Sequence, residues 1–437
     1  MKDAVREKLK RIMASRIFAL VRLWYHFALA GVAAAWYRFP SRHIQVIGIT
    51  GTKGKTTVVE LVHAMLRETG VKVASVSSER FRIGDWEEKN TRRMTMPGRF
   101  FLQGFLRRAV RERCAHAVIE VTSQGIAQFR HRFVRFRTVV VTNVAPEHIE
   151  AHGSFENYLR AKLDLFWRLP PEGTAIINTD DPHAARFAAA TVGRIIWFGK
   201  EGIRTAEEEW RVRDFRENAF GISFGLASNR GHHKETLYVS RLRGEFNAAN
   251  MLAAAAVGIS RHIASEKIAT GLMRVEGVAG RMEWIIHDPF AVVVDYAHTP
   301  DSLEEVYHAL ARSNGALICV LGSAGGGRDT WKRQEFGRIA SEYCATIVVT
   351  NEDPYDENPA HIIDEIVVGV SDQKKMCTHK ILDRREAIRF ALSAAKKGDT
   401  VVLTGKGSEP WIIGPHGTRT PWSESMVARE ELVEKIK

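Results

Sequence analysis

Short apolar runs alternate with amphipathic stretches along the chain from residue 44 onward. The runs have the length of buried strands, and the stretches between them place apolar residues three or four positions apart, as one face of a helix does. Strands that alternate with helices in this way predict parallel sheets covered by helices, the α/β class. In the first half of the chain the predicted strands are 43–50, 72–77, 115–121, 137–143 and 173–178, with helices at 100–113 and 155–169.

The pattern changes at 204–243, where polar and apolar positions alternate and helix signals are few. This stretch predicts a small antiparallel addition. Helical patterns return at 248–259 and 264–274, and a second doubly wound unit begins near Glu283. The predicted elements of that unit are strands at 291–296, 316–321, 346–350 and 400–404 and helices at 302–312, 331–343 and 384–396.

Three parts are therefore expected, since 437 residues exceed one ordinary core. Residues 1–43 form a basic and apolar helical segment. Residues 44–282 form a central domain with a phosphate-binding loop and a mostly parallel sheet. Residues 283–437 form a C-terminal, Rossmann-like α/β domain.

The clearest chemical signal follows the first strand, where residues 48–57 read Gly-Ile-Thr-Gly-Thr-Lys-Gly-Lys-Thr-Thr. A strand, a glycine-rich turn and a helix N-terminus form a phosphate cradle, in which Lys55 supplies a mobile positive charge and the Thr56 hydroxyl can hold Mg²⁺. Gly48 lies six residues before Gly54 rather than five, so the commonest P-loop spacing is not met. The sequence predicts a variant loop that binds a nucleoside triphosphate.

Other polar groups follow later strands, where open α/β sheets place their ligands. Glu120 is either a magnesium ligand or a solvated acid at a strand end. The turn after Thr142-Asn143 carries Glu147, His148, Glu150 and His152, which suit metal ligands, helix caps or a polar loop. A transition-metal site is the weaker interpretation, because neither cysteine nor a helical H-x-x-x-H accompanies them. Lys162 lies in an amphipathic helix, where an exposed lysine is the ordinary expectation.

Arginines alternate with aromatic rings at 129–137. This pattern fits a surface on which nucleic-acid bases stack, and it fits equally a strand with arginines on one side. In the second arrangement, one or two guanidinium groups facing the phosphate cradle would bind an anionic substrate.

The formal net charge of +12 suits nucleic acid, an anionic lipid surface or a highly anionic substrate. No arginine-rich tail or nucleic-acid motif accompanies the charge, so we expect no nucleic acid and favour a small anion or a membrane surface. The four cysteines lie far apart without a C-x-x-C pair. This spacing argues against a disulfide framework or structural zinc site and fits a reducing cytoplasm.

The N-terminal segment has an uncharged run of 15 residues, 23–37, after a basic stretch. As a helix the run is about 22 Å long, shorter than the roughly 30 Å hydrocarbon core, so a transmembrane span is not expected. Asp3 and Glu7 also weaken a signal-peptide interpretation. Two interpretations stay open: a helix that docks its apolar face on the next domain, and a helix at 11–37 that lies peripherally in the membrane interface.

Motifs in one order along residues 44–412 resemble those of the ATP-dependent Mur ligases, and within them the UDP-N-acetylmuramoyl-tripeptide synthetases of MurE type. In chain order the motifs are Gly51-Thr-Lys-Gly-Lys-Thr-Thr57, Glu120-Val-Thr-Ser-Gln-Gly125, Thr142-Asn143 with His148 and His152-Gly153, Ala161-Lys162, Gly244-Glu-Phe-Asn247 with Asn250, Gly280-Arg281-Met-Glu, Asp295-Tyr-Ala-His-Thr-Pro300, Asp383-Arg-Arg-Glu-Ala387 and Gly405-Lys-Gly407.

The resemblance implies a peptidoglycan-synthesis enzyme that uses ATP to activate a substrate carboxylate as an acyl phosphate, which an amino acid then attacks. It implies two Mg²⁺ ions, a carbamylated Lys162, a muramoyl-peptide-like anionic substrate and an amino acid, in the cytoplasm. Catalytic roles are implied for Lys55, Lys162 and His148, and metal contacts for Thr56, Glu120, His148 and Lys162. The nucleotide positions implied are Gly51, Thr52, Lys53, Gly54, Lys55, Thr56, Thr57, Asn247, Asn250, Arg281, Asp295, His298, Arg328 and Lys332. The substrate positions implied are Thr95, Thr122, Ser123, Arg130, Asp353, Tyr355, Gly405 and Glu409.

Two departures from the family pattern bear on the substrates. Residues 1–43 stand where the family carries a UDP-binding domain, so both a UDP-linked and a lipid-linked acceptor stay open, as does an anion site at Arg92, Arg93 and Arg99. Diaminopimelate-adding members carry Asp-Asn-Pro-Arg where this chain reads Glu352-Asp353-Pro354-Tyr355, and Ser408 replaces a frequent histidine. Loss of the bidentate arginine costs about 2 kcal/mol or more of discrimination. We therefore expect meso-diaminopimelate not to bind in the usual manner.

Two alternatives remain beside the MurE-like ligase. One is another ligase of the same fold, of folylpolyglutamate or cyanophycin type. The other is a non-catalytic, membrane-associated nucleotide-binding scaffold, which would require an impaired site although Lys55, Glu120 and Lys162 are all present.

Overall fold

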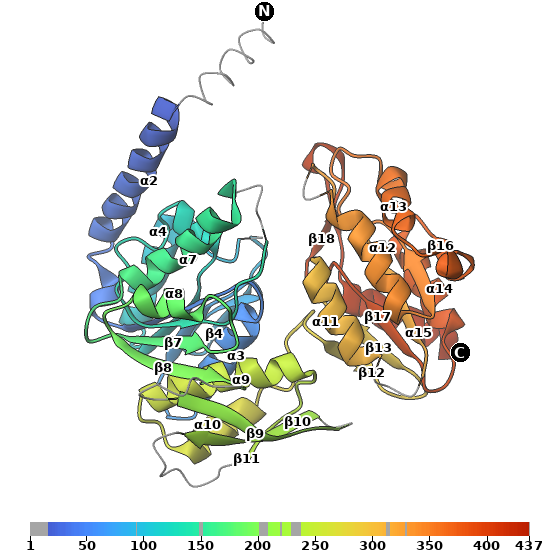
Figure 1. The fold of residues 1–437 in the computed structure, drawn as a ribbon. Helices are drawn as coiled ribbons and strands as arrows, with labels where there is room; N and C mark the ends of the chain where they lie inside the picture. Colours follow the sequence, from blue (N-terminus) through green and yellow to red (C-terminus); the bar gives the residue numbers. More distant parts are fainter. Residues whose placement is uncertain are drawn as a thin grey trace, which may run out of the picture. The chain divides into compact units, whose positions relative to one another are not determined.

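The computed structural model describes residues 16–92, 94–147, 152–200, 209–218, 221–228, 237–311, 315–327 and 330–436. The chain divides into two compact units (Figure 1). The first unit comprises residues 1–214, 225–238 and 249–272, and the second comprises residues 215–224, 239–248 and 273–437. Each has its own sheet and core, and the predicted α/β class is confirmed.

The sheet of the first unit has the strand order β11-β10-β9-β8-β7-β6-β1-β5-β2-β3-β4. Its strands are β1 (Gln45–Thr50), β2 (Val73–Val76), β3 (Arg80–Ile83), β4 (Trp86–Lys89), β5 (His116–Glu120), β6 (Phe136–Val141), β7 (Thr174–Asn178), β8 (Arg194–Gly199), β9 (Glu209–Asn218), β10 (Gly221–Ser228) and β11 (Leu237–Ser240). From β8 to β2 all neighbouring strands pair in parallel, and β1 lies between β5 and β6. The chain thus reverses its strand order at β1, the kind of position where doubly wound sheets bind ligands.

The region predicted as a small antiparallel addition contains β9, β10 and β11, which are neighbours at one end of this sheet. The first of them, β9, pairs in parallel with β8. These strands therefore form an addition to the main sheet, but the predicted antiparallel pairing is wrong where β9 meets β8. Period-two alternation reports a half-buried strand but carries no information about the direction of its partner.

Helices cover both faces of this sheet. They are α3 (Lys55–Arg67), α4 (Arg99–Arg111), α5 (Ser123–Ala127), α7 (Phe155–Trp167), α8 (Ala184–Ala189), α9 (Glu245–Ser260) and α10 (Ser265–Met273). On one face, side chains of α4, α7 and α8 join the core formed with β1, β5 and β6. On α3, Met65 lies against Gly258 and Gly271, where an added Cβ would approach its atoms within 2.6 and 2.3 Å. Small residues thus let α9 and α10 approach α3 closely.

The N-terminal helix α2 (Arg16–Trp36) docks on the first unit through its C-terminal half. Ala30, Ala33 and Ala34 are buried, and the Phe27 ring lies 5.3 Å from that of Phe133. This finding supports the docking interpretation. No helix in the described ranges combines the length and apolar character needed to cross a bilayer.

The outward face of α2 is apolar as well. Every side chain between Val21 and Trp36 that is described as exposed is uncharged; these are Val21, Trp24, Tyr25, Ala28, Val32, Ala35 and Trp36. We call these seven residues the outer stripe. Trp24 and Trp36 are 71% and 75% exposed. Among its described side chains, α2 therefore turns no charge to water, which is atypical of a surface helix.

The second unit has a six-stranded sheet in the order β12-β13-β17-β14-β15-β16. Its strands are β12 (Glu283–Ile286), β13 (Ala291–Val294), β14 (Leu317–Leu321), β15 (Thr346–Val349), β16 (Thr378–Lys380) and β17 (Thr400–Leu403), and β18 (Trp411–Ile413) pairs separately with β19 (Arg419–Pro421). The five strands from β13 to β16 are parallel, and β12 is antiparallel to β13. Helices α11 (Pro300–Leu310), α12 (Lys332–Tyr343) and α13 (Pro359–Val368) pack on one face, and α14 (Arg384–Ala394) and α15 (Glu424–Ile436) pack on the other.

Candidate active site

The phosphate loop joins β1, in the interior of the sheet, to the N-terminus of α3. Gly54 adopts φ 80°, and a Cβ at this residue would lie 2.2 Å from Oδ1 of Asn250. Only glycine fits there, and Asn250 is thereby placed against the loop. The Lys55 amine donates to the carbonyl oxygen of Thr52 at 2.6 Å, which holds it above its own loop. Thr57, in the first turn of α3, is buried.

Thr56 and Glu120 meet where β1 and β5 end side by side. The Thr56 hydroxyl donates to Oε2 of Glu120 at 3.1 Å, and the amide of Ser78 donates to the same oxygen at 2.8 Å. Glu120 is 2% exposed, so a carboxylate has been buried beside a hydroxyl at the helix N-terminus. Hard oxygen donors in this position suit Mg²⁺, which takes few protein ligands and completes its shell with phosphate and water.

Lys162 is fully buried, contrary to the ordinary expectation for a lysine on an amphipathic helix. It extends from α7 to the loop, where its amine donates to the carbonyl oxygen of Gly51 at 2.6 Å. Burial, and then the charge of Lys55, hold the pKa of Lys162 well below its usual range. The lowered pKa favours the neutral amine, which is the nucleophilic form.

Residues after β6 hold the other side of the loop. The Thr142 hydroxyl donates to the carbonyl oxygen of Lys53 at 2.6 Å, and the Lys53 amide donates to the Asn143 side chain at 2.9 Å. The hydroxyl groups of Thr52 and Tyr158 are 2.7 Å apart. These contacts hold the phosphate loop against the residues that follow β6 on one side and against α7 on the other.

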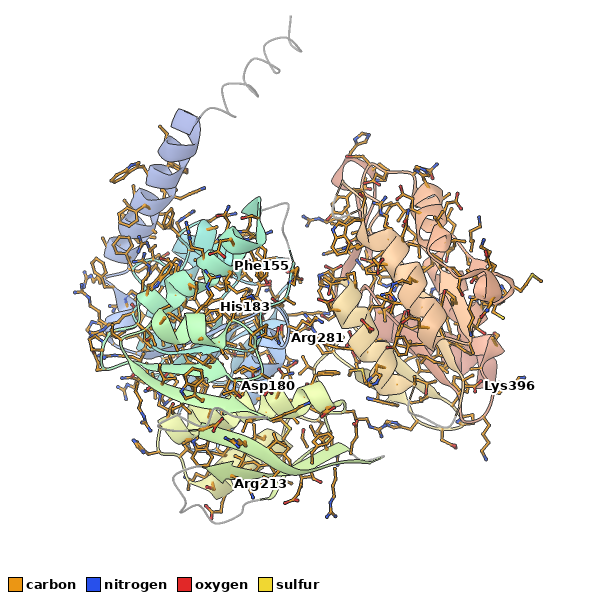
Figure 2. All side chains as sticks on the ribbon, viewed as in Figure 1. Phe155, Asp180, His183, Arg213, Arg281 and Lys396 are labelled. Carbon is orange, nitrogen blue, oxygen red and sulfur yellow. The ribbon has the colours of Figure 1, made fainter. Side chains whose placement is uncertain are left out.

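The outer wall beside α7 is aromatic. Phe155, at the start of α7, lies with its ring 5.2 Å from that of His183, just before α8 (Figure 2). Near the same end of α7, the His152 ring lies 5.4 Å from the Tyr158 ring, and its Nε2 is 3.1 Å from the Ser123 hydroxyl. Burial, and then Lys162, lower the pKa of His152, which favours its neutral form.

Four of the candidate residues, Arg93, His148, Glu150 and Arg328, lie outside the described residues. In the ranges that the structure does describe, no three His, Cys, Asp or Glu side chains gather into a metal cluster. A transition-metal site of that kind therefore finds no support among them, whereas the Thr56–Glu120 pair needs no such cluster.

The predicted substrate residues of the first unit lie around the N-termini of α4 and α5. The hydroxyls of Thr95 and Ser78 are 2.8 Å apart, and Thr122 caps α5 by accepting from the Gly125 amide. Arg130 donates through Nη2 to Oε1 of Gln128 at 2.6 Å and through Nη1 to the carbonyl oxygen of Met96.

Arg130 also lies close enough to Arg99 for their charges to interact. Burial, and then the charge of Arg99, lower the pKa of Arg130. Arg99 donates to the carbonyl oxygen of Gln128, and no carboxylate among the described residues pairs with either guanidinium. Two desolvated like charges held by neutral acceptors are typical of an anion-binding site.

In the second unit, the predicted residues follow β13. The Asp295 carboxylate accepts from the amides of Met282 and Ala297, each at 2.7 Å, and burial raises the pKa of this group. Lys332 donates to the carbonyl oxygen of His298 at 3.2 Å. The guanidinium of Arg281 lies 4.6 Å from the centre of the Tyr296 ring.

Asp353 and Glu409 meet at Lys406, after β17. The Lys406 amine donates to Oδ1 of Asp353 at 2.9 Å and to Oε2 of Glu409 at 2.6 Å. Gly405 has φ 100° and approaches Glu352, and Tyr355 has φ 52°. Asn247, on α9, donates from its side-chain amide to the carbonyl oxygen of Arg243.

The sequence matches the family model of the Mur ligase middle domain at residues 49–258 and that of the Mur ligase glutamate ligase domain at residues 280–407. It is 37% identical, over 93% of this chain and 82% of the relative, to the UDP-N-acetylmuramyl-tripeptide synthetase of Roseiflexus sp. (strain RS-1). The chain belongs to the Mur ligase family. The resemblance predicted from the motifs is thus confirmed, and the protein is an ATP-dependent ligase.

Other Mur ligases extend the comparison. The chain is 34% identical, over 93% of its length and 81% of the relative, to the UDP-N-acetylmuramoyl-L-alanyl-D-glutamate--2,6-diaminopimelate ligase of Aquifex aeolicus (strain VF5). A solved structure of an enzyme with that name is 28% identical, with a TM-score of 0.63, over 90% of this chain and 79% of the other. The folylpolyglutamate synthase of Mycobacterium tuberculosis has a TM-score of 0.69 but 17% identity, over 90% of this chain and 96% of the other, which shows a shared fold only.

Several residues of this Mur ligase site are absent from the sequence-based prediction. Ser78 supports Glu120, Tyr158 supports Thr52, and Gln128 supports both Arg99 and Arg130. The position of Ser78 just after β2 was a usable signal, because β2 is parallel to β5 and ends at the same sheet edge. Tyr158 and Gln128 gave no such signal, since their roles depend on tertiary contacts.

Proposed function

We propose that this Mur ligase joins an amino acid to the carboxyl group of a muramoyl-peptide acceptor in peptidoglycan synthesis, with ATP converted to ADP and phosphate. The observation that carries the proposal is the group of Lys55, Thr56, Glu120 and buried Lys162 around one phosphate loop. Phosphate release that requires both a muramoyl dipeptide and an amino acid tests it. Phosphate release that depends on neither, or nucleotide binding without turnover, would contradict it and favour a scaffold.

In the proposed reaction, an acceptor carboxylate oxygen attacks the γ-phosphorus and the bond to the β–γ bridging oxygen breaks, releasing ADP. The amino group of the incoming amino acid then attacks the acyl carbon. Phosphate leaves with the acyl oxygen, and the amine gives up a proton. The loop amides and Lys55 would hold the phosphates, and Arg99 and Arg130 would orient the anionic acceptor.

Thr56 and Glu120 would hold a first Mg²⁺, and carbamylated Lys162 and His148 a second. Bound magnesium would neutralise phosphate charge as the γ-phosphoryl group is transferred. A neutral amine is the form that adds carbon dioxide, so the lowered pKa of Lys162 supports the modification. Addition of carbon dioxide to the neutral amine releases one proton and leaves an anionic oxygen ligand, which the charge of Lys55 attracts.

Asn250 and, in the second unit, Asn247, Arg281, Asp295, His298, Arg328 and Lys332 are proposed to contact the nucleotide. Thr95, Thr122, Ser123, Asp353, Tyr355, Gly405 and Glu409 are proposed to contact the two other substrates. For the amino acid, we propose a side chain other than that of meso-diaminopimelate. Tyr355 stands where the family arginine would bind the distant carboxylate, and the neighbouring Asp353 accepts from Lys406 and from the Ile413 amide.

We also propose that the enzyme works in the cytoplasm at the inner face of the membrane, with the outer stripe of α2 in the bilayer interface. Trp and Tyr side chains favour that interface, and exposed Arg38 and Arg42 follow the helix. The opposite side of α2 contacts Phe129 and Phe133, which flank Arg130. Because one helix adjoins both the lipid surface and the proposed anion site, we propose a lipid-linked muramoyl peptide as the acceptor.

A further inference from the structure

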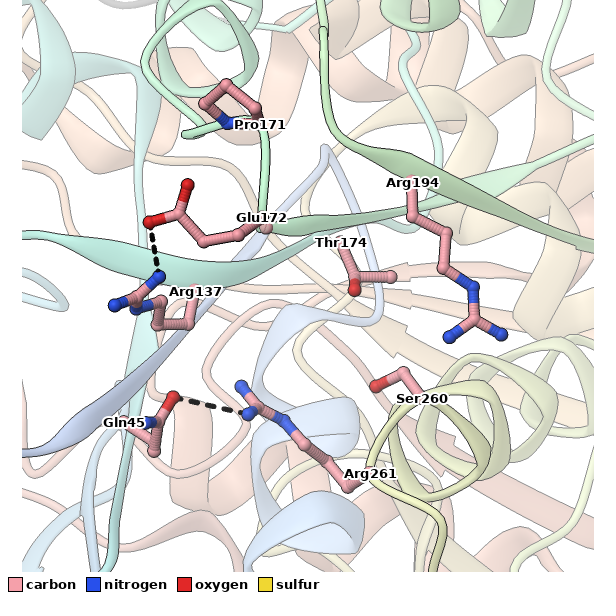
Figure 3. Close-up of a pocket in the computed structure, with 9 residues that line it drawn as sticks. Gln45, Arg137, Pro171, Glu172, Thr174, Arg194, Ser260 and Arg261 are labelled. Atoms are coloured by element: carbon pink, nitrogen blue, oxygen red, sulfur yellow. Dashed lines mark hydrogen bonds and ion pairs between the residues drawn. The ribbon is translucent and has the colours of Figure 1, made fainter.

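A hollow of about 370 Å³ lies at the amino-terminal edge of the first unit's sheet (Figure 3). Gln45, Thr174 and Arg194 begin strands β1, β7 and β8, and Arg137 is the second residue of β6. The phosphate loop follows the opposite, carboxyl-terminal end of β1. The hollow is therefore separated from the proposed active site by the length of a strand.

Positive charge predominates in this hollow. Among the described residues that line it, the guanidinium groups of Arg137, Arg194 and Arg261 stand against one carboxylate, that of Glu172. Glu172 is also shared, because it accepts from Arg135 and from Arg137, each at 2.6 Å. Figure 3 shows the Arg261 guanidinium extending toward Gln45 and the Arg194 guanidinium on the other side of Ser260, both away from Glu172.

The crowding of positive charge is most evident at Arg261, just after α9. This arginine donates to Oε1 of Gln45 at 3.2 Å and to the Thr138 hydroxyl at 2.9 Å, both neutral acceptors. Its Nε is buried without a hydrogen-bond partner. Burial, and then the charge of Arg137, lower the pKa of Arg261. Crowded like charges with an unsatisfied donor destabilise the protein by itself and would be relieved by an anion.

The same positive charge affects the pKa of His116, at the start of β5. Burial, and then Arg261, lower the pKa of His116 to about 4, and its Nδ1 is buried without a partner. A purely structural role as a tie between α9 and the sheet accounts for the two hydrogen bonds of Arg261. The hollow is also lined by the guanidinium groups of Arg137 and Arg194, so it holds more positive charge than this tie requires.

We propose that this hollow is a second anion site that binds a small phosphate- or carboxylate-bearing molecule. Guanidinium groups suit such ligands because their paired N–H groups match the oxygens of phosphate and carboxylate. Thr174 adds a hydroxyl group to the lining, whereas the Ser260 hydroxyl already donates to the carbonyl oxygen of Val257 at 2.7 Å. The volume exceeds that of a single ion and approaches the lower range of small-metabolite pockets. The ligand is either the phosphate that the ligase itself releases or a separate polyanionic metabolite.

Calorimetric titration of the full chain tests the proposal, with a non-hydrolysable ATP analogue saturating the phosphate loop. Inorganic phosphate, pyrophosphate and citrate serve as probes at constant ionic strength. We expect at least one probe to bind with one site per chain. Tightest binding of phosphate would indicate the reaction product as ligand, and tightest binding of pyrophosphate or citrate would indicate a separate metabolite.

Arg194→Gln and Arg261→Gln should each weaken binding at least about tenfold, because each removes one bidentate charged contact. Arg111→Gln, on the exposed end of α4, is the matched control and should leave binding unchanged. Arg261→Gln also removes two internal hydrogen bonds, so a loss of binding in that variant alone can reflect misfolding. Arg194→Gln leaves those two hydrogen bonds in place and tests binding independently. In the wild type, the bound anion should raise the pKa of His116 measured by NMR. Absence of binding by all three probes, or equal binding in all variants, would overturn the second site without bearing on the ligase activity.

Discussion

The amine of Lys162 donates to the carbonyl oxygen of Gly51, so that a fully buried lysine contacts the first residue of the phosphate loop. Because burial and Lys55 favour its neutral form, this amine is suited to carbamylation. Lys162→Ala should lower kcat roughly a hundredfold or more, in line with the loss of one charged group acting on the transition state. Steady-state phosphate release with saturating substrates measures the effect.

A short carboxylic acid such as acetate should partly restore the Lys162→Ala enzyme, because it can place a carboxylate where the carbamate would lie. Arg160→Ala, an exposed residue on the same helix, is the control and should behave as the wild type. Full activity of Lys162→Ala would exclude the proposed ligand role, and a loss without acetate rescue would favour a structural one.

Glu120→Gln keeps the shape of the side chain but removes its charge. The hydrogen bond from Thr56 can persist, whereas attraction for Mg²⁺ is reduced. We expect the Mg²⁺ concentration at half-maximal rate to rise at least about tenfold. A magnesium titration of the rate provides the measurement, and an unchanged midpoint would show that Glu120 is not a ligand.

A screen of ATP consumption with diaminopimelate, lysine, ornithine and other amino acids addresses the second substrate. We expect no preference for meso-diaminopimelate, since Tyr355 offers no bidentate partner for its distant carboxylate. Tyr355→Arg should raise kcat/KM for diaminopimelate relative to lysine by about tenfold or more. Strong selectivity of the wild-type enzyme for diaminopimelate over lysine would refute the proposal.

The outer stripe predicts an effect on lipid binding. The double substitution Trp24→Glu and Trp36→Glu places two charges in it and should abolish co-sedimentation with anionic vesicles. Trp167→Glu is the matched control, because Trp167 is an exposed tryptophan on α7. Unchanged vesicle binding of the double variant, or of a chain lacking residues 1–40, would contradict the interfacial role.

The same double variant distinguishes a lipid-linked acceptor from a UDP-linked one. With a polyprenyl-diphosphate-linked muramoyl dipeptide in vesicles, the double variant should lose most of its activity. With a UDP-linked dipeptide in solution, wild type and variant should be equal. Wild-type activity with the UDP-linked acceptor alone would reject the lipid-linked substrate yet leave the ligase activity standing.

His63, buried on α3, predicts a pH effect on stability. Burial, and then Arg82, lower its pKa from 6.5 to about 3. The unfolded chain therefore binds the proton more readily, so stability is retained above the unfolded pKa and declines as the pH falls toward the folded one. Between about pH 7 and about pH 4.5, the wild type should lose about 2 kcal/mol more than His63→Gln. Urea unfolding at both pH values measures this, and parallel losses would contradict it.

Sequence patterns predicted the main strands well, because β1, β5, β6, β13 and β17 are short apolar runs buried in their sheets. The strand β4 was missed because periodicity carries little signal in four largely exposed residues. The ten-residue helix α13 was missed although Asn358 caps it and Pro359 begins it, which are both helix-start signals.

For the site, the phosphate loop and Glu120 were accessible from the sequence because their chemistry follows directly from a strand end. Lys162 was accessible only through the family resemblance, since its position on an amphipathic helix looks ordinary until its burial is known. The pairing of Arg99 with Arg130 depends on Gln128, a residue that no spacing rule selects.

The path of the chain between the two units has a practical consequence for dissecting the enzyme. Segments 215–224 and 239–248 belong to the second unit, whereas 225–238 and 249–272 return to the first, so the backbone passes between them five times. No single cut yields two complete pieces, because a fragment ending at residue 282 carries parts of the second unit and a fragment starting at 283 lacks them. The same two segments contain parts of β9, β10 and β11, which are strands of the first unit's sheet, so a rearranged chain cannot reconnect them to residues 273–437 without cutting that sheet.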